Sequence, residues 1–208
     1  MGVKAAIGHT AAPPDRIRAA VEEGACLSTH LGNAGDPLVL RLKNHLWEQL
    51  AEDRLTACMI CDGFHLPKSA VQVFARAKGL DRLILVSDAA YPGGLEPGVY
   101  RWNDVDVQVF GDGHLGLPGS ESHAGAAHLL DWDISRFMEF TGYSLQETIP
   151  LCTQNPARIL STPDNYGRLK PGAPANLVMF DYVPGMDRLK VLKTVRCGRE
   201  VYSSLSDC

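Results

Sequence analysis

Short apolar runs alternate with helix-like segments along the first ninety residues. Two of these segments, 13–24 and 67–79, begin at proline, carry apolar residues on one face and end at glycine, as helices do. A third, 44–53, also has helical character. Each lies between runs of strand length, so the pattern predicts repeated strand–helix units around a parallel sheet. The strand candidates are 3–9, 25–30, 55–63 and 82–90.

Beyond the fourth strand the pattern changes. Glycine and proline become dense, and residues 99–110 alternate apolar and polar side chains as a hairpin does. Apolar residues at helical spacing predict a helix over 120–140. Ser144 and Glu147 form the capping box of another helix. The tail, 167–204, alternates short strands with Gly and Pro turns, which fits a small β domain.

Composition narrows the class of partner. The 208 residues are 45% hydrophobic and 21% charged, with a net charge of -4, so a folded globular chain is expected. Without a basic patch or a long apolar stretch, we expect no nucleic acid, no membrane, a cytoplasmic location and a small-molecule partner. The six cysteines are scattered, which speaks against a disulfide framework. Cys58 and Cys61 lie three apart on a predicted strand, so a redox or zinc role for this pair is disfavoured.

Four polar residues follow the predicted parallel strands in turn: His9, His30, His65 and Asp88. The carboxyl ends of such strands are where barrel enzymes place their active sites. A single histidine at this position is more often a structural residue, and an aspartate can cap the next turn. Imidazoles and a carboxylate converging on one rim are what a divalent metal and its water require.

The remaining histidines show no convincing ligand spacing. His45 lies on the segment 44–53 of helical character and His114 in a glycine-rich turn, whereas His123 and His128 are five apart on the helix expected over 120–140. Structural or surface roles are therefore expected for all four.

Several motifs together resemble the amidohydrolase superfamily, and within it the N-acetylglucosamine-6-phosphate deacetylases. They follow in the same order over nearly the whole chain. The motifs "THLGNAGDP", "CDGFH" and "LVSDA" are specific to these deacetylases, whereas the C-terminal signature is shared by many amidohydrolases. The motifs are "GHT", "THLGNAGDP", "CDGFH", "LVSDA", "LPGS" and "NPARIL" followed by "GRLKPGAPANLVMFD".

The resemblance implies a chemistry for the rim. It makes His9 and His30 ligands of a divalent cation, with zinc first and iron or manganese as alternatives. It makes Asp88 the general acid/base that serves a metal-activated water. The implied reaction removes the N-acetyl group of N-acetylglucosamine 6-phosphate and releases acetate.

Substrate contacts are implied for further positions. Arg41 falls where the family places an arginine for the substrate phosphate, donated across a dimer interface, but the surrounding "LRLKNHLWEQ" departs from the family pattern and puts phosphate recognition in doubt. Another amide or cyclic amide is therefore an alternative substrate. The other implied contacts are Asn33, Ala34, Asp62, Gly63, Phe64, His65, Leu117, Pro118 and Gly119.

The resemblance begins at the fifth strand of an eight-stranded barrel. The expected fold is therefore α/β: the C-terminal half of a (β/α)8 TIM-type barrel over 1–162, with strands 5–8, and part of a small β-sandwich domain over 163–208. A full barrel needs ~250 residues. We expect a homodimer or a missing N-terminal barrel half to cover the open strand edges. A catalytically inactive fragment is the other alternative.

Overall fold

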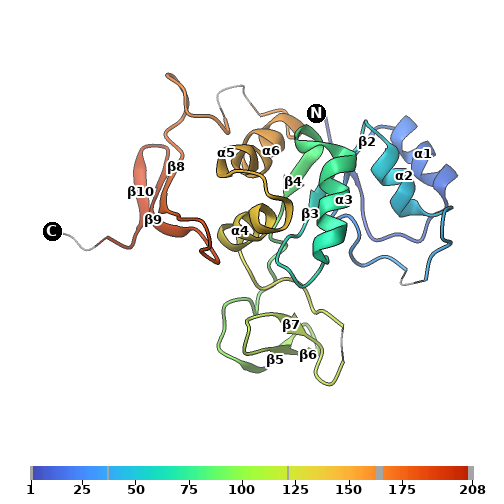
Figure 1. Cartoon of the computed structure of the whole chain (residues 1–208), viewed down its shortest axis with the longest axis horizontal. Helices are drawn as coiled ribbons and strands as arrows, with labels where there is room; N and C mark the ends of the chain where they lie inside the picture. The colour runs from blue at the N-terminus through green and yellow to red at the C-terminus, as the bar shows by residue number, and fades with distance from the viewer. Residues whose placement is uncertain (1, 37, 121, 163–165, 206–208) are drawn as a thin grey trace.

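The computed structural model describes residues 2–36, 38–120, 122–162 and 166–205. Its main body is a four-stranded parallel sheet in the order β1-β2-β3-β4, with a helical segment between each consecutive pair (Figure 1). This confirms the predicted strand–helix alternation. The elements are β1 (Ala5–Ile7), α1 (Pro14–Glu22), β2 (Ala25–Ser28), α2 (His45–Ala51), β3 (Thr56–Met59), α3 (Lys68–Lys78), η1 (Leu80–Arg82) and β4 (Leu83–Leu85).

Local sequence explains the two longer helices of this body. Pro14 begins α1, where its missing N–H costs nothing and its fixed φ suits the first turn. In α3, Val71, Phe74 and Ala75 lie on one face and are buried, as predicted. Gly79 then ends the helix with φ 67, a left-handed value that glycine adopts without strain.

Two antiparallel sheets complete the fold, and both lie beside the main body (Figure 1). The predicted hairpin over 99–110 is confirmed and gains a third strand, and the strand-rich tail forms the second sheet. Leu189 from the tail is buried in the main core, which joins this sheet to the body. The strands are β5 (Gly98–Trp102), β6 (Val105–Val109), β7 (Leu115–Gly116), β8 (Leu177–Asp181), β9 (Lys190–Arg196) and β10 (Arg199–Ser203).

The helix expected over 120–140 is wrong in its first half. Only Leu130–Thr141, α4, is helical, and 122–129 are irregular. Gly125 explains the difference: its φ is 95, and a Cβ there would lie 2.8 Å from Ala90. The segment instead passes closely beside the chain after β4, where Ala90 N donates to Ala126 O at 2.8 Å.

The remaining helices close the core over the sheet. The capping box of Ser144 and Glu147 is confirmed at the start of α5. The main core contains Met59, Leu85 and Phe137, all at most 2% exposed. Among the described residues, no helix is long and apolar enough to cross a membrane. The last elements are α5 (Leu145–Thr148), η2 (Ile149–Cys152) and α6 (Gln154–Ile159).

The division of the chain at 162/163 stays a prediction. Residues 163–165 lie outside the described residues, so the boundary itself is not described.

Cys58 and Cys61 are free thiols, and burial raises the pKa of Cys58 to about 11, which suits an unreactive thiol rather than a redox centre.

Candidate active site

His9 and His30 meet at the carboxyl ends of β1 and β2, with their Nε2 atoms 2.9 Å apart. Thr29 N donates to Ile7 O at 2.8 Å and keeps the two segments side by side. His9 is exposed, whereas His30 is 7% exposed. The backbone of His30 has φ 25, a rare value for a residue other than glycine and one that is often found at functional sites.

The two imidazoles fit part of a divalent metal site. Two nitrogens that bind one cation at ~2.1 Å with tetrahedral geometry lie ~3.4 Å apart, so the observed 2.9 Å requires the rings to move apart by only about 0.5 Å to share a cation. Within the described part of the chain, no group of three or more His, Cys, Asp or Glu side chains is placed to hold a metal. His9 and His30 are therefore two candidate ligands of an incomplete set.

The turn after His30 carries two implied substrate contacts. Asn33 N donates to His30 O at 3.0 Å, and Ala34 has φ 48. Asn33 Nδ2 is buried and has no hydrogen-bond partner among the described residues. Arg41 lies further along the loop, exposed, and its carbonyl accepts from Trp47 Nε1 at 2.9 Å.

Asp62 organises the loop that follows β3. Its Oδ1 accepts from the backbone N of Phe64 and of His65, both at 2.9 Å, and its Oδ2 lies 2.7 Å from His65 Nδ1. Burial opposes ionisation of Asp62, but the hydrogen bonds from His65 and Phe64 outweigh it and lower the pKa of this carboxyl. With Nδ1 donating to this carboxylate, Nε2 is the nitrogen of His65 that remains for another partner. Gly63, with φ 89, makes the turn between them.

Asp88 follows β4 by three residues and is exposed. Its φ of 49 places it in the left-handed region, as His30 and Ala34 are. Because the sheet is parallel, His9, His30, the Asp62–His65 loop and Asp88 all lie at its carboxyl edge, in strand order. Their individual roles stay predictions.

Leu117, Pro118 and Gly119 form a turn after β7. Ser120 N donates to Leu117 O at 3.1 Å, and Gly119 has φ 72, which its lack of a Cβ permits. Leu117 N also donates to Ser122 O at 3.0 Å, so the turn is closed on itself.

Three of the four histidines that the sequence left without a role gather beside the Asp62–His65 loop, whereas His45 lies on α2 with Nδ1 3.3 Å from Gln49 Nε2. His123 stacks on His65 with ring centroids 4.9 Å apart, and His114 and His128 both stack on Phe64, at 5.0 and 5.7 Å. Helical spacing alone cannot find this cluster, because it depends on the hairpin and on the irregular segment 122–129. In the sequence, the predicted hairpin over 99–110 was the feature that could have indicated that the chain turns back and brings His114 toward the Asp62–His65 loop.

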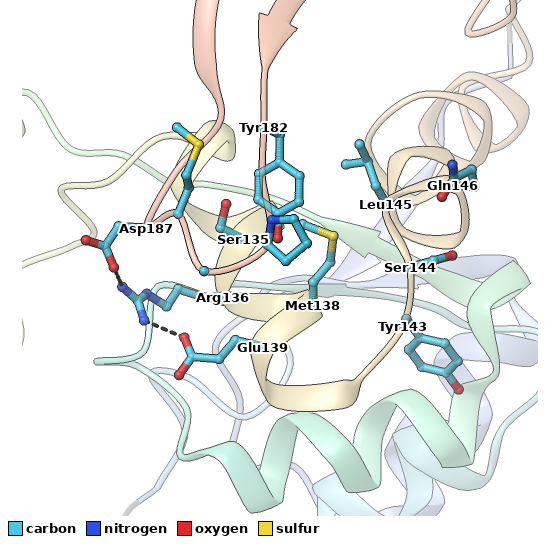
Figure 2. A pocket seen from close by; sticks show the side chains of 13 residues that line it. Ser135, Arg136, Met138, Glu139, Tyr143, Ser144, Leu145, Gln146, Tyr182 and Asp187 are labelled. Carbon is cyan, nitrogen blue, oxygen red and sulfur yellow. Dashed lines mark hydrogen bonds and ion pairs between the residues drawn. The ribbon is translucent and has the colours of Figure 1, made fainter.

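A cavity of about 760 Å³ lies between α4, α5 and the turn after β8 (Figure 2). None of the predicted site residues lines it. On its wall, Arg136 forms ion pairs with Glu139 and Asp187, both at 2.5 Å. This cavity is therefore separate from the rim at the carboxyl edge of the sheet.

Comparison with known proteins confirms the resemblance to N-acetylglucosamine-6-phosphate deacetylases. The N-acetylglucosamine-6-phosphate deacetylase of Lysinibacillus sphaericus is 31% identical over 199 residues, covering 95% of this chain and 49% of that protein. The N-acetylgalactosamine-6-phosphate deacetylase of Escherichia coli O157:H7 is 29% identical, covering 86% of this chain and 47% of that protein.

Solved structures are similar over the same extent. The crystal structure of N-acetyl-D-glucosamine-6-phosphate deacetylase from Mycobacterium smegmatis superposes with a TM-score of 0.85 at 31% identity, covering 97% of this chain and 52% of that one. The chain thus spans about half the length of the relatives that it matches. The model of the amidohydrolase family matches residues 4–205, and the chain therefore belongs to the amidohydrolase family.

Proposed function

We propose that this chain forms part of a metal-dependent deacetylase that hydrolyses the N-acetyl group of an amino sugar 6-phosphate, N-acetylglucosamine 6-phosphate first. The observation that carries the proposal is the approach of His9 Nε2 to His30 Nε2, 2.9 Å, on the rim that also bears Asp88. The names of the relatives support the substrate class. The galacto epimer is the nearest alternative sugar.

In this proposal Asp88 moves the proton. Its exposed carboxylate accepts a proton from the attacking water and returns it to the nitrogen of the leaving amine, so that amide and water become amine and acetate. The left-handed backbone at Asp88 turns the chain at the rim directly after the strand.

The other residues bind and orient. His9 and His30 would hold a divalent cation, which when bound lowers the pKa of its water to ~7 and polarises the acyl oxygen. His65 and Asn33 would contact the sugar, because the loops that carry them follow β3 and β2 at the rim. Zinc is the first candidate cation, because imidazole nitrogens suit it well, with iron or manganese as alternatives.

We infer that residues 1–162 supply four strand–helix units of an eight-stranded barrel and that 163–208 supply strands of a small β domain. The parallel order β1-β2-β3-β4 and the relatives' double length support this. A second polypeptide segment with parallel strands, or a second copy of the chain, would cover the open edges of β1 and β4.

The test is acetate release from N-acetylglucosamine 6-phosphate by the purified chain, with and without added Zn²⁺, together with elemental analysis of bound metal. The same assay is run after adding the N-terminal half of the Lysinibacillus sphaericus relative. Activity that requires metal and is lost in Asp88→Asn supports the proposal. Absence of activity and of stoichiometric metal under both conditions overturns it and leaves the inactive-fragment alternative.

A further inference from the structure

Two consecutive residues of α4, Trp132 and Asp133, hydrogen-bond to the backbone of the loop that leads to His65. Trp132 Nε1 donates to Asp62 O at 2.9 Å. Asp133 Oδ1 accepts from Cys61 N at 3.2 Å. The bonds join positions 70 and 72 residues apart in the chain, so α4 fixes both the carbonyl of Asp62 and the amide of the residue before it.

Asp62 passes this constraint on to His65. Its carboxylate accepts from the backbone N and lies 2.7 Å from Nδ1 of His65, so the position and rotation of Asp62 determine where the imidazole points. Asp62 is 3% exposed and His65 is largely buried. A buried carboxylate with these bonds has little freedom to rotate independently of its backbone.

Trp132 is itself held on its ring. His128 stacks on it at 4.2 Å with an interplanar angle of 10°, and the guanidinium of Arg136 lies 4.5 Å from the ring centroid. Figure 2 shows Arg136 in turn tied to Glu139 and Asp187. The indole N–H is thus aimed at Asp62 O by contacts with the ring and not by the hydrogen bond alone.

Asp133 is an unusual choice for this position because its side chain is fully buried, with Oδ2 unpartnered among the described residues. Burial, together with the nearby charges of Asp62 and Asp131, raises the pKa of this carboxyl to about 8. A neutral Asp133 can accept from Cys61 N without placing a second buried charge behind Asp62.

We propose that Trp132 and Asp133 are positioning residues for His65: through Cys61 and Asp62 they fix the imidazole that faces the substrate. The proposal rests on the proposed function for what His65 contacts, but the positioning itself is a property of the free chain. Both α4 residues act through hydrogen bonds to the backbone of Cys61 and Asp62 and not through a bond to His65 itself. Their loss should therefore loosen His65 while the fold and the pair His9–His30 persist.

The test uses matched variants of the 208-residue chain. Trp132→Phe keeps the stacked ring and removes the N–H, and Trp47→Phe is its control, because Trp47 Nε1 makes a bond of equal length to Arg41 O. Asp133→Asn keeps an acceptor for Cys61 N, and Asp133→Leu removes it. The readout is the downfield NMR signal of the His65 Nδ1 proton, assigned by its loss in His65→Gln.

We expect that signal in the wild type, in Trp47→Phe and in Asp133→Asn, and its broadening beyond detection in Trp132→Phe and Asp133→Leu. An unchanged signal in folded Trp132→Phe overturns the proposal, even if Asp133→Leu fails to fold. Binding of N-acetylglucosamine 6-phosphate, measured in parallel, should weaken about fivefold in Trp132→Phe, the effect of one hydrogen bond. If the wild type shows the proton signal but no binding, the proposed function fails and the positioning stands.

Discussion

At the carboxyl ends of β1 and β2, three buried polar atoms have no hydrogen-bond partner within the described residues: Ser28 Oγ, His30 Nδ1 and Asn33 Nδ2. At the end of β3, both oxygens of Asp62 are bonded, and His65 is held at its backbone and at Nδ1. Unpartnered buried polar atoms are costly, and the first set lies beside His9, which is exposed, so we expect this end of the sheet to receive a metal or ligand. The loop after β3 is held by α4 of the same chain, although Asp133 Oδ2 and His128 Nε2 beside it also lack a partner among the described residues.

This contrast separates two tasks at one rim. The carboxyl ends of β1 and β2 bring two imidazole Nε2 atoms together and carry strained backbone at His30 and Ala34, as expected of a site that receives a metal or a substrate group. At the carboxyl end of β3, the carboxylate of Asp62 bonds to the loop and holds the His65 imidazole in place. Each of the following predictions tests whether this division is correct.

Asp88→Asn carries the largest expected effect. If Asp88 moves the proton, deacetylation of N-acetylglucosamine 6-phosphate should fall by about 10²–10⁴-fold in kcat, because asparagine cannot accept the proton. The control is Asp106→Asn, on the exposed hairpin strand β6, which should retain full activity. Equal activity of Asp88→Asn and the wild type would remove Asp88 from the mechanism.

His30→Ala has the next largest expected effect and tests the carboxyl ends of β1 and β2 directly. Removing one of the two converging imidazoles should weaken Zn²⁺ binding by about 100-fold, which competition with a coloured chelator measures. His123→Ala removes an exposed imidazole beside the β3 loop and should leave zinc affinity unchanged. If both variants bind zinc as tightly as the wild type, the metal lies elsewhere in the chain.

Much of the frame could be predicted from local sequence. Proline starts and glycine ends marked α1 and α3, and apolar runs of strand length placed four polar groups at one rim. These features depend on neighbours within a few residues. The false helical turns over 122–129 came from the same local reasoning, because the close approach of Gly125 to Ala90 is a tertiary contact.

The hydrogen bonds from α4 to the β3 loop could not be predicted from the sequence for the same reason. Trp132 and Asp133 read as ordinary residues of an amphipathic helix, and nothing within the helix indicates that they bond to Cys61 and Asp62. Sequence pattern therefore found the residues that end the strands, and missed those that position them from another element.

Asp133→Asn tests the contact between α4 and the β3 loop through the free energy of unfolding. The pKa of Asp133 is raised from 3.8 to about 8 in the folded chain, so between these values the folded state binds a proton that the unfolded state releases. The wild type therefore loses up to about 1.4 kcal/mol of stability per pH unit as pH rises from ~4 to ~8. Urea unfolding should find the two proteins similar at pH ~4 and the variant increasingly more stable as the pH rises to ~8. A pH-independent difference would contradict a neutral Asp133.

Arg41→Ala has the smallest expected effect and decides between the substrate alternatives. Arg41 is exposed, so a contact with a phosphate would be screened and worth about 1 kcal/mol, which corresponds to about fivefold in kcat/KM. That loss should appear with N-acetylglucosamine 6-phosphate and be absent with N-acetylglucosamine. Lys43→Ala, an exposed cation in the same loop, serves as the control and should change neither. Equal effects on both sugars would mean that Arg41 shapes the loop through its carbonyl bond to Trp47, and the case for a phosphorylated substrate would then rest on the other rim residues.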